Sequence, residues 1–151
     1  MKNVVDPVSS LCSSGMECEF AGDFKKAISL YKKAWKISDT SYQKCVAAHY
    51  VARHQKNTKI KLQWNLLSLK NARKTKFEIV NPVRSRSRSV IAASNGVKSF
   101  FPSLYINIGQ NYESLNKIKI AKKYYALAEK NIKYLPKNSY GSNIRKIIQK
   151  R

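Results

Sequence analysis

The sequence predicts an all-α protein, an α-α superhelix of about three antiparallel helix pairs followed by a C-terminal capping helix. Two stretches, 94 residues apart, share one template of small and aromatic residues. In each, a glycine is followed 12 positions later by an alanine, 4 later by a tyrosine and 3 later by a second alanine. Glycine inside a helix costs about 1 kcal/mol relative to alanine. Its recurrence therefore indicates a second helix that passes too close for a β-carbon. The residues are Gly15, Ala27, Tyr31 and Ala34, then Gly109, Ala121, Tyr125 and Ala128.

The first pair is expected as helices near 8–20 and 24–37. Gly22 and Asp23 form the turn between them, and Asp23 is placed as the N-cap of the second helix. Tyr31 is expected to fill the space beside Gly15, and Tyr125 the space beside Gly109 in the later copy.

The second pair is predicted near 41–56 and 59–72 from its periodicity alone. Tyr50 stands at the glycine position of the template. In the second helix, apolar residues recur at spacings of four, three and three, so one face is buried: Leu62, Leu66, Leu69 and Ala72.

A basic linker is expected over residues 73–97, with an irregular and mobile chain at 73–96. Asn81-Pro82 breaks a helix, and the run Arg84–Ser89 is of low complexity and repels itself. A short helical turn at 90–93 is the alternative within this stretch. Helices resume near 98–115 and 118–132, with Pro102 at the start of a helix or at a bend. A short amphipathic helix at 141–150 is expected to cap the array.

These residues and spacings resemble the tetratricopeptide repeat, with repeats at about 8–38, 42–72 and 102–135 in a single domain, 1–151. The resemblance implies a small solitary protein of bacterial type, a non-catalytic scaffold or adaptor that binds a protein or peptide in its concave groove. In the family, the first helix of each pair supplies the groove residues. At the matching positions stand Met16, Glu19, Phe20, Val51, His54, Gln55, Asn107, Gln110 and Glu113, together with Cys12, Ala47 and Ile106.

Members of this family that grip a chaperone's C-terminal carboxylate use a lysine and an asparagine in the first repeat. Cys12 and Met16 stand at those positions here, so the resemblance does not extend to binding of chaperone tails.

The net charge of +22 supports an alternative function, binding of RNA or another polyanion. Residues 1–39 contribute +1, and residues 40–151 contribute +21. The alternative uses the linker and the outer helix faces, where lysines alternate with tyrosines. Its candidate residues are Arg84, Arg86, Arg88, Lys122 and Lys123. Solvated lysines on helix faces, without a dedicated anion site, are the competing explanation, but the size of the excess favours at least a weak, salt-sensitive contact with polyanions.

The sequence gives little support for catalysis. It has no glycine-rich phosphate loop and no convincing carboxylate pair. Cys45 and His49 share a helical spacing, but two ligands do not make a zinc site. We therefore expect no enzyme, no cofactor and no metal. We also expect a cytoplasmic location, because neither a signal sequence nor a membrane span is recognisable.

Overall fold

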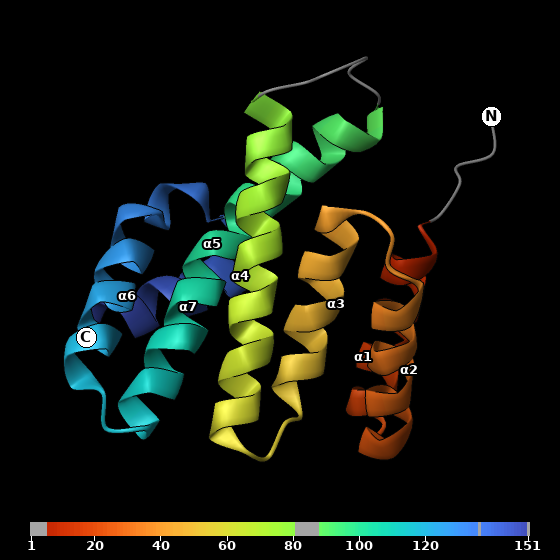
Figure 1. Cartoon of the computed structure of the whole chain (residues 1–151), viewed down its shortest axis with the longest axis horizontal. Helices are drawn as coiled ribbons and strands as arrows, with labels where there is room; N and C mark the ends of the chain where they lie inside the picture. The colour runs from red at the N-terminus through yellow and green to blue at the C-terminus, as the bar shows by residue number, and fades with distance from the viewer. Residues whose placement is uncertain (1–5, 81–87, 136, 151) are drawn as a thin grey trace.

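The computed structural model describes residues 6–80, 88–135 and 137–150, without the side chains of residues 78–80 and 88–96. The described chain is all-α, with no strand, as the sequence predicts (Figure 1). Its elements are α1 (Pro7–Phe20), α2 (Phe24–Ile37), α3 (Ser41–Arg53), α4 (Thr58–Val80), α5 (Arg88–Ser114), α6 (Ile118–Lys130), the 3₁₀ helix η1 (Ile132–Tyr134) and α7 (Ser139–Gln149).

The expectation of an irregular chain at 73–96 is wrong at both ends. Helix α4 continues to Val80, and α5 begins at Arg88. Residues 70–77 are rich in good helix formers, so their charges belong to a solvated helix face instead of a coil. Pro102 lies inside α5 and does not start it. Arg84 and Arg86 lie outside the described residues.

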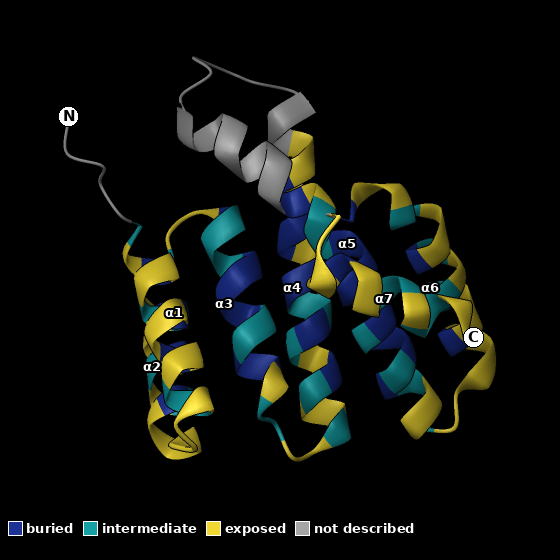
Figure 2. Ribbon diagram, turned by 180° about the vertical axis from the view of Figure 1, so that it is seen from behind, coloured by how far each residue is buried: buried dark blue, intermediate teal, exposed yellow. Residues whose placement is uncertain are grey.

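The helices pack as successive antiparallel pairs, α1 with α2, α3 with α4 and α5 with α6. Contacts of α3 with both α1 and α5 place these three helices in an inner row. Figure 2, seen from behind, shows α1, α3, α5 and α7 on the near side, with α2 behind α1. Helices α2, α4 and α6 form the outer row, nearer the viewer in Figure 1. Helix α7 packs on α5 and α6 at the C-terminal end of the array.

The expected contact between glycine and tyrosine is confirmed in both good copies. A β-carbon on Gly15 would collide with the ring of Tyr31, and one on Gly109 would lie 2.6 Å from Cε1 of Tyr125. In the middle pair, Tyr50 stands at the glycine position and its ring instead stacks on Tyr31, with centroids 5.0 Å apart. The template therefore sets how closely the helices approach within the first and third pairs.

The turns of these two pairs also share a backbone conformation. Gly22 has φ +82° and Asn116 has φ +64°, and each lies seven residues after the packed glycine of its pair. Asparagine is among the few other residues that adopt this left-handed conformation readily. The next residue caps the second helix, and the expected N-cap is confirmed for Asp23, whose carboxylate accepts from Lys26 N at 3.1 Å.

The apolar core has two parts that meet between the first and third pairs. One is formed by α1, α2 and α3 around the buried Tyr31. The other joins α3, α4, α5 and α6 around Leu69, Leu104 and Ile108. Tyr42 and Phe100 contact both parts, so the three pairs form one continuous packing unit.

Candidate functional site

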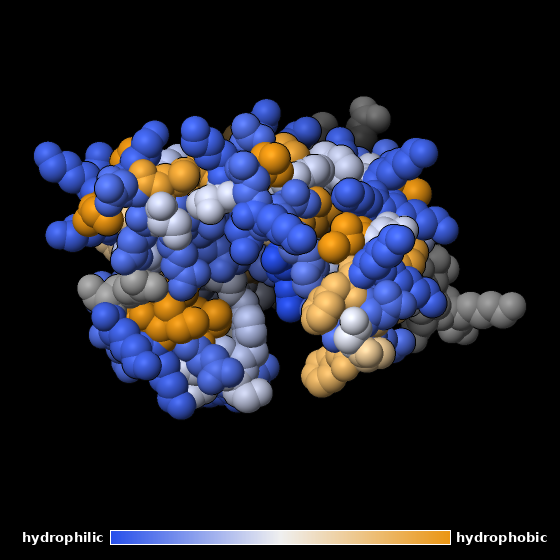
Figure 3. Space-filling model, turned by 90° about the horizontal axis from the view of Figure 1, so that it is seen from below, coloured by the Kyte–Doolittle hydropathy of each residue, from blue (hydrophilic) through white to orange (hydrophobic). Residues whose placement is uncertain are grey.

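The inner helices enclose a hollow that is open to one side of the molecule. Figure 3, seen from below, shows this hollow between two arms, the arm of α1 and α2 on the right and the arm of the C-terminal helices on the left. Apolar patches lie on both arms, while the floor between them is largely hydrophilic. The hollow is the concave face of the array.

A pocket of about 180 Å³ opens in the region where α3, α4 and α5 meet. Its walls consist of amides, cations, one histidine and one alanine, and they contain no carboxylate. The lining residues are His49, Ala52 and Arg53 of α3, Lys61 and Asn65 of α4, and Asn107, Gln110 and Asn111 of α5. The pocket thus reaches past the inner row to the outer helix α4.

Two predicted groove residues, Met16 and Phe20, lie exposed on α1. Phe20 is 98% exposed and Met16 is 36% exposed. The hydroxyl of Tyr50 donates to Met16 Sδ at 3.3 Å, which places Met16 beside α3. Phe24, the first residue of α2, is also 53% exposed. Together these three residues make an apolar surface near the α1–α2 turn.

Glu19 is held by three neighbours and is therefore not an independent ligand contact. Its carboxylate accepts from the hydroxyl of Tyr31 at 2.6 Å, lies 2.6 Å from Nε2 of His54 and pairs with Arg53 at 3.0 Å. Burial raises the pKa of Glu19, but the hydrogen bonds from Tyr31 and His54 and the charge of Arg53 outweigh burial and hold that pKa below its usual range. His54, another predicted groove residue, is thereby fixed between α1 and α3.

Glu113 has the same partner in the third pair, since it accepts from the hydroxyl of Tyr125 at 2.5 Å. Gln55 is half-buried, and its amide donates to the carbonyl of Val51 at 3.2 Å. Asn107 and Gln110 both line the pocket and are half-buried. Of the predicted groove residues, these two amides are the ones that the structure brings together around a cavity.

Val51 does not reach the hollow, so its prediction as a groove residue is wrong. Its side chain is 3% exposed and belongs to the core around Tyr31. Three other residues at groove positions of the template are also buried in the core and not exposed in the hollow, because the inner helices are packed from both sides. They are Cys12, Ala47 and Ile106, each 3% exposed or less.

Six residues of the pocket wall are not among the predicted groove residues, but two of these six have a recognisable sequence pattern. Asn65 and Asn111 are polar residues on buried helix faces, three positions after Leu62 and Ile108 respectively. The amide of Asn65 donates to Oδ1 of Asn111 at 2.8 Å and joins α4 to α5. The other four, His49, Ala52, Arg53 and Lys61, have no such signature.

His49 is a half-buried histidine of the pocket wall, and its Nδ1 atom is buried. Its ring meets Tyr50 and Phe100 edge-on, with centroids 5.4 and 5.5 Å away. Burial, together with the charge of Arg53, lowers the pKa of His49 to about 4. The side chain is therefore neutral at neutral pH.

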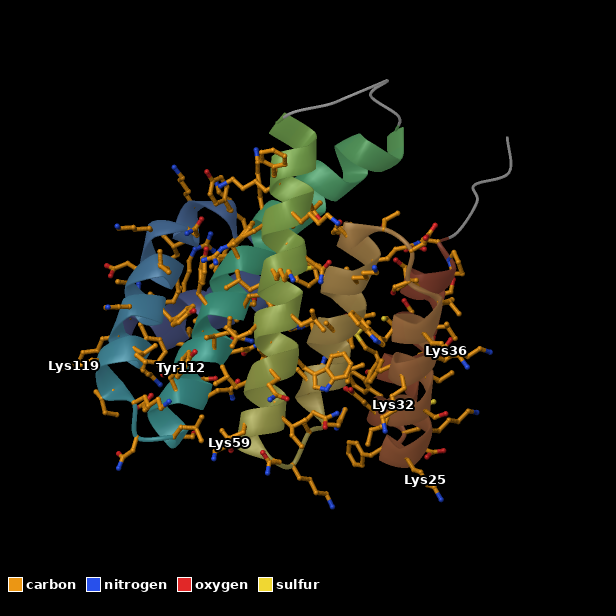
Figure 4. All side chains as sticks on the ribbon, in the orientation of Figure 1. Lys25, Lys32, Lys36, Lys59, Tyr112 and Lys119 are labelled. Carbon is orange, nitrogen blue, oxygen red and sulfur yellow. The ribbon has the colours of Figure 1, made fainter. Side chains whose placement is uncertain are left out.

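The positive charge of the chain lies mainly on the outer helices. Every charged residue of α2 is a lysine, and the same holds for α6 apart from Glu129. In α4, all charged residues up to Phe77 are lysine or arginine. Figure 4 shows Lys25, Lys32 and Lys36 of α2, with Lys59 and Lys119 on the next two outer helices. By contrast, the charged residues of α1 are Glu17 and Glu19.

The residues predicted for polyanion binding are only partly described by the structure, and those described differ in exposure from their neighbours. Lys122 and Lys123 are exposed on α6, as expected. The neighbouring aromatics, Tyr124 and Tyr125, are half-buried, and Tyr125 packs against Gly109. Arg88 begins α5, but its side chain is not described, and Arg84 and Arg86 lie outside the described residues. The ring of Tyr124 is stacked on that of Tyr112, with centroids 5.5 Å apart.

Among the described residues no group of three His, Cys, Asp or Glu side chains is arranged to hold a metal ion. Burial raises the pKa of the thiols of Cys12 and Cys45 to about 12, so both are protonated at neutral pH. Each helix in the described part of the chain is too short or too polar to cross a membrane.

Comparison with known proteins identifies one match. Residues 102–131, from Pro102 of α5 to the end of α6, match the family model of the tetratricopeptide repeat. Neither a curated protein nor a solved structure matches the chain. The matched pair contains Gly109 and Tyr125, and the first pair repeats their packing with Gly15 and Tyr31. The third helix pair therefore matches a tetratricopeptide repeat.

Proposed function

We propose that the protein is a non-catalytic scaffold or adaptor that binds a peptide, or an extended segment of a protein, in the hollow of the inner helices. The observation that carries this proposal is the pocket in that region, walled by Asn107 and Gln110 of α5 together with groups from α3 and α4. Carboxamides suit a peptide because each supplies both hydrogen-bond donors and acceptors.

The apolar surface of Met16, Phe20 and Phe24 supports the same proposal. Phe20 has almost its whole side chain in solvent, which makes it available to a partner's apolar side chain. Aromatic residues bury a large area on binding and are enriched among residues that dominate interface energies. A peptide in the hollow would thus meet an apolar contact at one arm and polar contacts at the floor.

The proposal is tested by selecting binders from a random peptide library displayed on phage, with the intact protein as bait. We expect enriched peptides whose affinity, measured by calorimetry, falls about tenfold or more in Gln110→Ala and in Phe20→Ser. A loss of that size corresponds to about 1.4 kcal/mol per contact. Phe77→Ser is the matched control for Phe20→Ser, because Phe77 is 67% exposed near the far end of α4.

Circular dichroism establishes that each variant remains folded. An absence of enriched peptides would contradict the proposal. So would peptides whose affinity is the same for the wild type, Gln110→Ala and Phe20→Ser.

We keep polyanion binding as a second candidate, and the charge of α2, α4 and α6 is the observation that favours it. A single-stranded RNA is the test ligand, since a flexible strand can follow a convex surface while lysines neutralise its phosphates. The half-buried positions of Tyr124 and Tyr125 weaken the case for base stacking beside Lys122 and Lys123.

A labelled 20-nucleotide RNA titrated at about 50 and 200 mM salt distinguishes the two functions, because each phosphate contact contributes a slope of roughly −0.7 to the salt dependence. The polyanion function predicts binding at the lower salt that weakens in Lys32→Glu and in Lys122→Glu. Lys146→Glu is the matched control, because it reverses the charge of an exposed lysine on α7, outside the three outer helices. Absence of binding at the lower salt would exclude this candidate.

The cytoplasmic location stays a prediction.

A further inference from the structure

The three turns that join the two helices of each pair lie along one edge of the molecule, at the bottom of Figure 1. They connect α1 to α2, α3 to α4 and α5 to α6. Side chains in the first turn of a helix lean towards its N-terminus, so those of α2, α4 and α6 project towards this edge. We call it the turn edge and define it as residues 20–26, 54–60 and 115–120.

Large apolar side chains are exposed in all three segments of the turn edge. The exposed fractions are 98% for Phe20, 53% for Phe24, 44% for Ile60, 44% for Ile118 and 36% for Ile120. These are five of the ten large apolar side chains that are exposed in the described part of the chain. Exposed apolar side chains are thus concentrated where the second helix of each pair begins.

Exposed lysines alternate with these apolar side chains in each segment. They are Lys25, Lys26, Lys56, Lys59, Lys117 and Lys119. Figure 4 labels one lysine from each segment, Lys25, Lys59 and Lys119, and each lies near the turn of its own pair. The same combination of lysine and a large apolar residue therefore occurs three times along one edge.

Carboxylates do little to neutralise the turn edge. Asp23 is the one acidic residue in its three segments, and its carboxylate caps α2. The preceding helical turns of α1 and α5 add Glu17, Glu19 and Glu113. Of these, Glu19 pairs with Arg53, and Glu113 accepts a hydrogen bond from a tyrosine. The six exposed lysines leave this edge with an excess of positive charge.

This combination fits the surface of an anionic membrane better than a protein or a nucleic acid. The core of a protein interface is depleted in charge, whereas lysines separate the apolar side chains here. Single-stranded nucleic acid is bound by stacking on aromatic rings, but three of the five apolar side chains are isoleucines. The interface of a bilayer accepts both kinds of residue, because apolar side chains enter the acyl boundary while lysines extend to the headgroups.

We propose that the turn edge docks the protein on the surface of an anionic membrane. Its apolar side chains enter the boundary between headgroups and acyl chains, and its lysines contact the anionic headgroups. The three segments follow one another along the edge, so they can meet a flat surface together (Figure 1). Docking of this kind needs no helix that crosses the membrane. The proposal goes beyond the peptide-binding function and does not depend on it.

Flotation with lipid vesicles tests the proposal. One set contains phosphatidylcholine with about 30% phosphatidylserine, the other contains phosphatidylcholine alone, and both are used at about 150 mM salt. We expect the protein to bind the anionic vesicles at least about tenfold more tightly, since each basic residue near such a surface strengthens binding about fivefold. Equal binding to both sets, or binding to neither, would overturn the proposal.

Ile60→Ser and Ile118→Ser separate docking through the turn edge from a general attraction of the basic outer helices, because both leave the charge unchanged. We expect each variant to weaken binding to anionic vesicles about fivefold, and the double variant about twentyfold. Ile37→Ser is the matched control, because Ile37 is 42% exposed at the opposite end of α2. Unchanged binding in the double variant, or an equal loss in Ile37→Ser, would contradict docking through this edge.

Charge reversal tests the lysines in the same way. Lys59→Glu and Lys119→Glu should each weaken binding about tenfold or more, because each replaces an attractive charge by a repulsive one. The control is Lys36→Glu, which changes an exposed lysine beside Ile37 at the far end of α2. An equal loss in all three variants would show that overall charge, and not the turn edge, determines vesicle binding.

A tryptophan at the turn edge reports directly on contact with lipid. Ile60→Trp should show blue-shifted fluorescence with anionic vesicles, and brominated lipids should quench it. Ile37→Trp should show neither effect, and the wild type gives the background of the half-buried Trp35 and Trp64. Equal quenching of Ile60→Trp and Ile37→Trp would contradict the proposed orientation.

The choice of Ile60 and Ile118 keeps this proposal separate from the functions proposed above, because neither residue belongs to the peptide site. Peptide binding without vesicle binding would leave the peptide function intact and reject docking. Vesicle binding without peptide binding would do the reverse. Binding of RNA that weakens in Ile60→Ser and Ile118→Ser, with no binding to vesicles, would assign the turn edge to nucleic acid and overturn the proposal.

Discussion

The ring of Tyr31 occupies the space in which a β-carbon of Gly15 would lie. Tyr31 is 1% exposed and is stacked on Tyr50, so it has little room to move away. Tyr125 makes the same contact with Gly109, but its side chain is half-buried, whereas that of Tyr31 is buried. The same template pair is thus rigid in the first repeat and more adaptable in the third.

Gly15→Ala should therefore lower the free energy of unfolding by about 1–2 kcal/mol. The helix gains about 1 kcal/mol from alanine, but overlap with a buried ring costs about 2–3 kcal/mol, the upper part of the usual range for overpacking. Gly109→Ala should be less costly, because the ring of Tyr125 is half-buried and that of Tyr31 is buried. Urea unfolding followed by circular dichroism measures both. A wild-type or higher stability of Gly15→Ala would contradict this packing argument.

His49 makes the stability of the protein depend on pH. Its pKa of about 4 in the folded state lies below the value of about 6.5 for an unfolded chain. The unfolded state therefore binds the proton more readily. The resulting contribution to stability is full above about pH 6.5 and is lost as the pH falls towards about 4, by at most about 1.4 kcal/mol per pH unit.

His49→Phe should remove this dependence, since phenylalanine can keep the edge contacts to Tyr50 and Phe100. The measurement is the difference in unfolding free energy between the two proteins at pH 7, 6 and 5. We expect the wild type to lose stability relative to the variant as the pH decreases. A difference that is constant with pH would show that His49 is not a buried neutral histidine.

The sequence predicted the contacts of Gly15 and Gly109 correctly, because the template encodes close approach. It did not predict the role of Glu19 and Glu113, which were assigned to the groove by position. Both glutamates precede a template tyrosine by twelve residues and accept a hydrogen bond from its hydroxyl. That repeated spacing was visible, but helical periodicity indicates a face of the helix and does not determine which side chains meet across the pair.

At the scale of elements, the second helices of the first and third pairs begin with the same backbone and different side chains. Asp23 has φ −89° and ψ 72°, and Lys117 has φ −101° and ψ 65°. Asp23 caps α2 through its carboxylate, whereas Lys117 makes no side-chain cap to α6. The third pair therefore has a cap position of suitable geometry without a capping side chain.

Lys117→Asp should raise the free energy of unfolding by about 1 kcal/mol, because an aspartate at this position accepts from a first-turn N–H and interacts favourably with the helix dipole. Lys117→Ala is the control, since it removes the lysine without adding a cap. Asp23→Ala should cost a similar amount in the first pair. Thermal and urea unfolding of the three variants measure these changes. Equal stabilities of Lys117→Asp and Lys117→Ala would contradict the expected cap.

The elements themselves were largely predictable, since α1, α2, α3 and α6 end within a few residues of their predicted limits. The errors lie at 73–80 and 88–97, where charge and serine content favoured a loop. Lysine, arginine and alanine are good helix formers whatever their net charge, so α4 extends beyond its apolar stripe. The pocket was not predictable as a whole, because it combines residues of three helices that only the packing brings together.

At the scale of the whole molecule, the charge of the described helices is divided by face as well as by position along the chain. The balance of +1 in residues 1–39 combines acidic groups, including Glu17 and Glu19 of α1, with the lysines of α2. Counting along the sequence hides this division, which appears only when the helices are assigned to inner and outer rows. The inner row keeps its few charges near neutrality while the outer row carries most of the excess.

Among the described helices, this division amounts to an electric dipole from the concave to the convex side. An anionic surface exerts a torque on such a dipole before any specific contact forms, and the outer helices turn towards it. The mouth of the hollow then points away from the surface, towards solution. On a cation exchanger, the protein should therefore bind through its positively charged outer helices. The hollow then stays accessible, and the immobilised protein should still capture ligands.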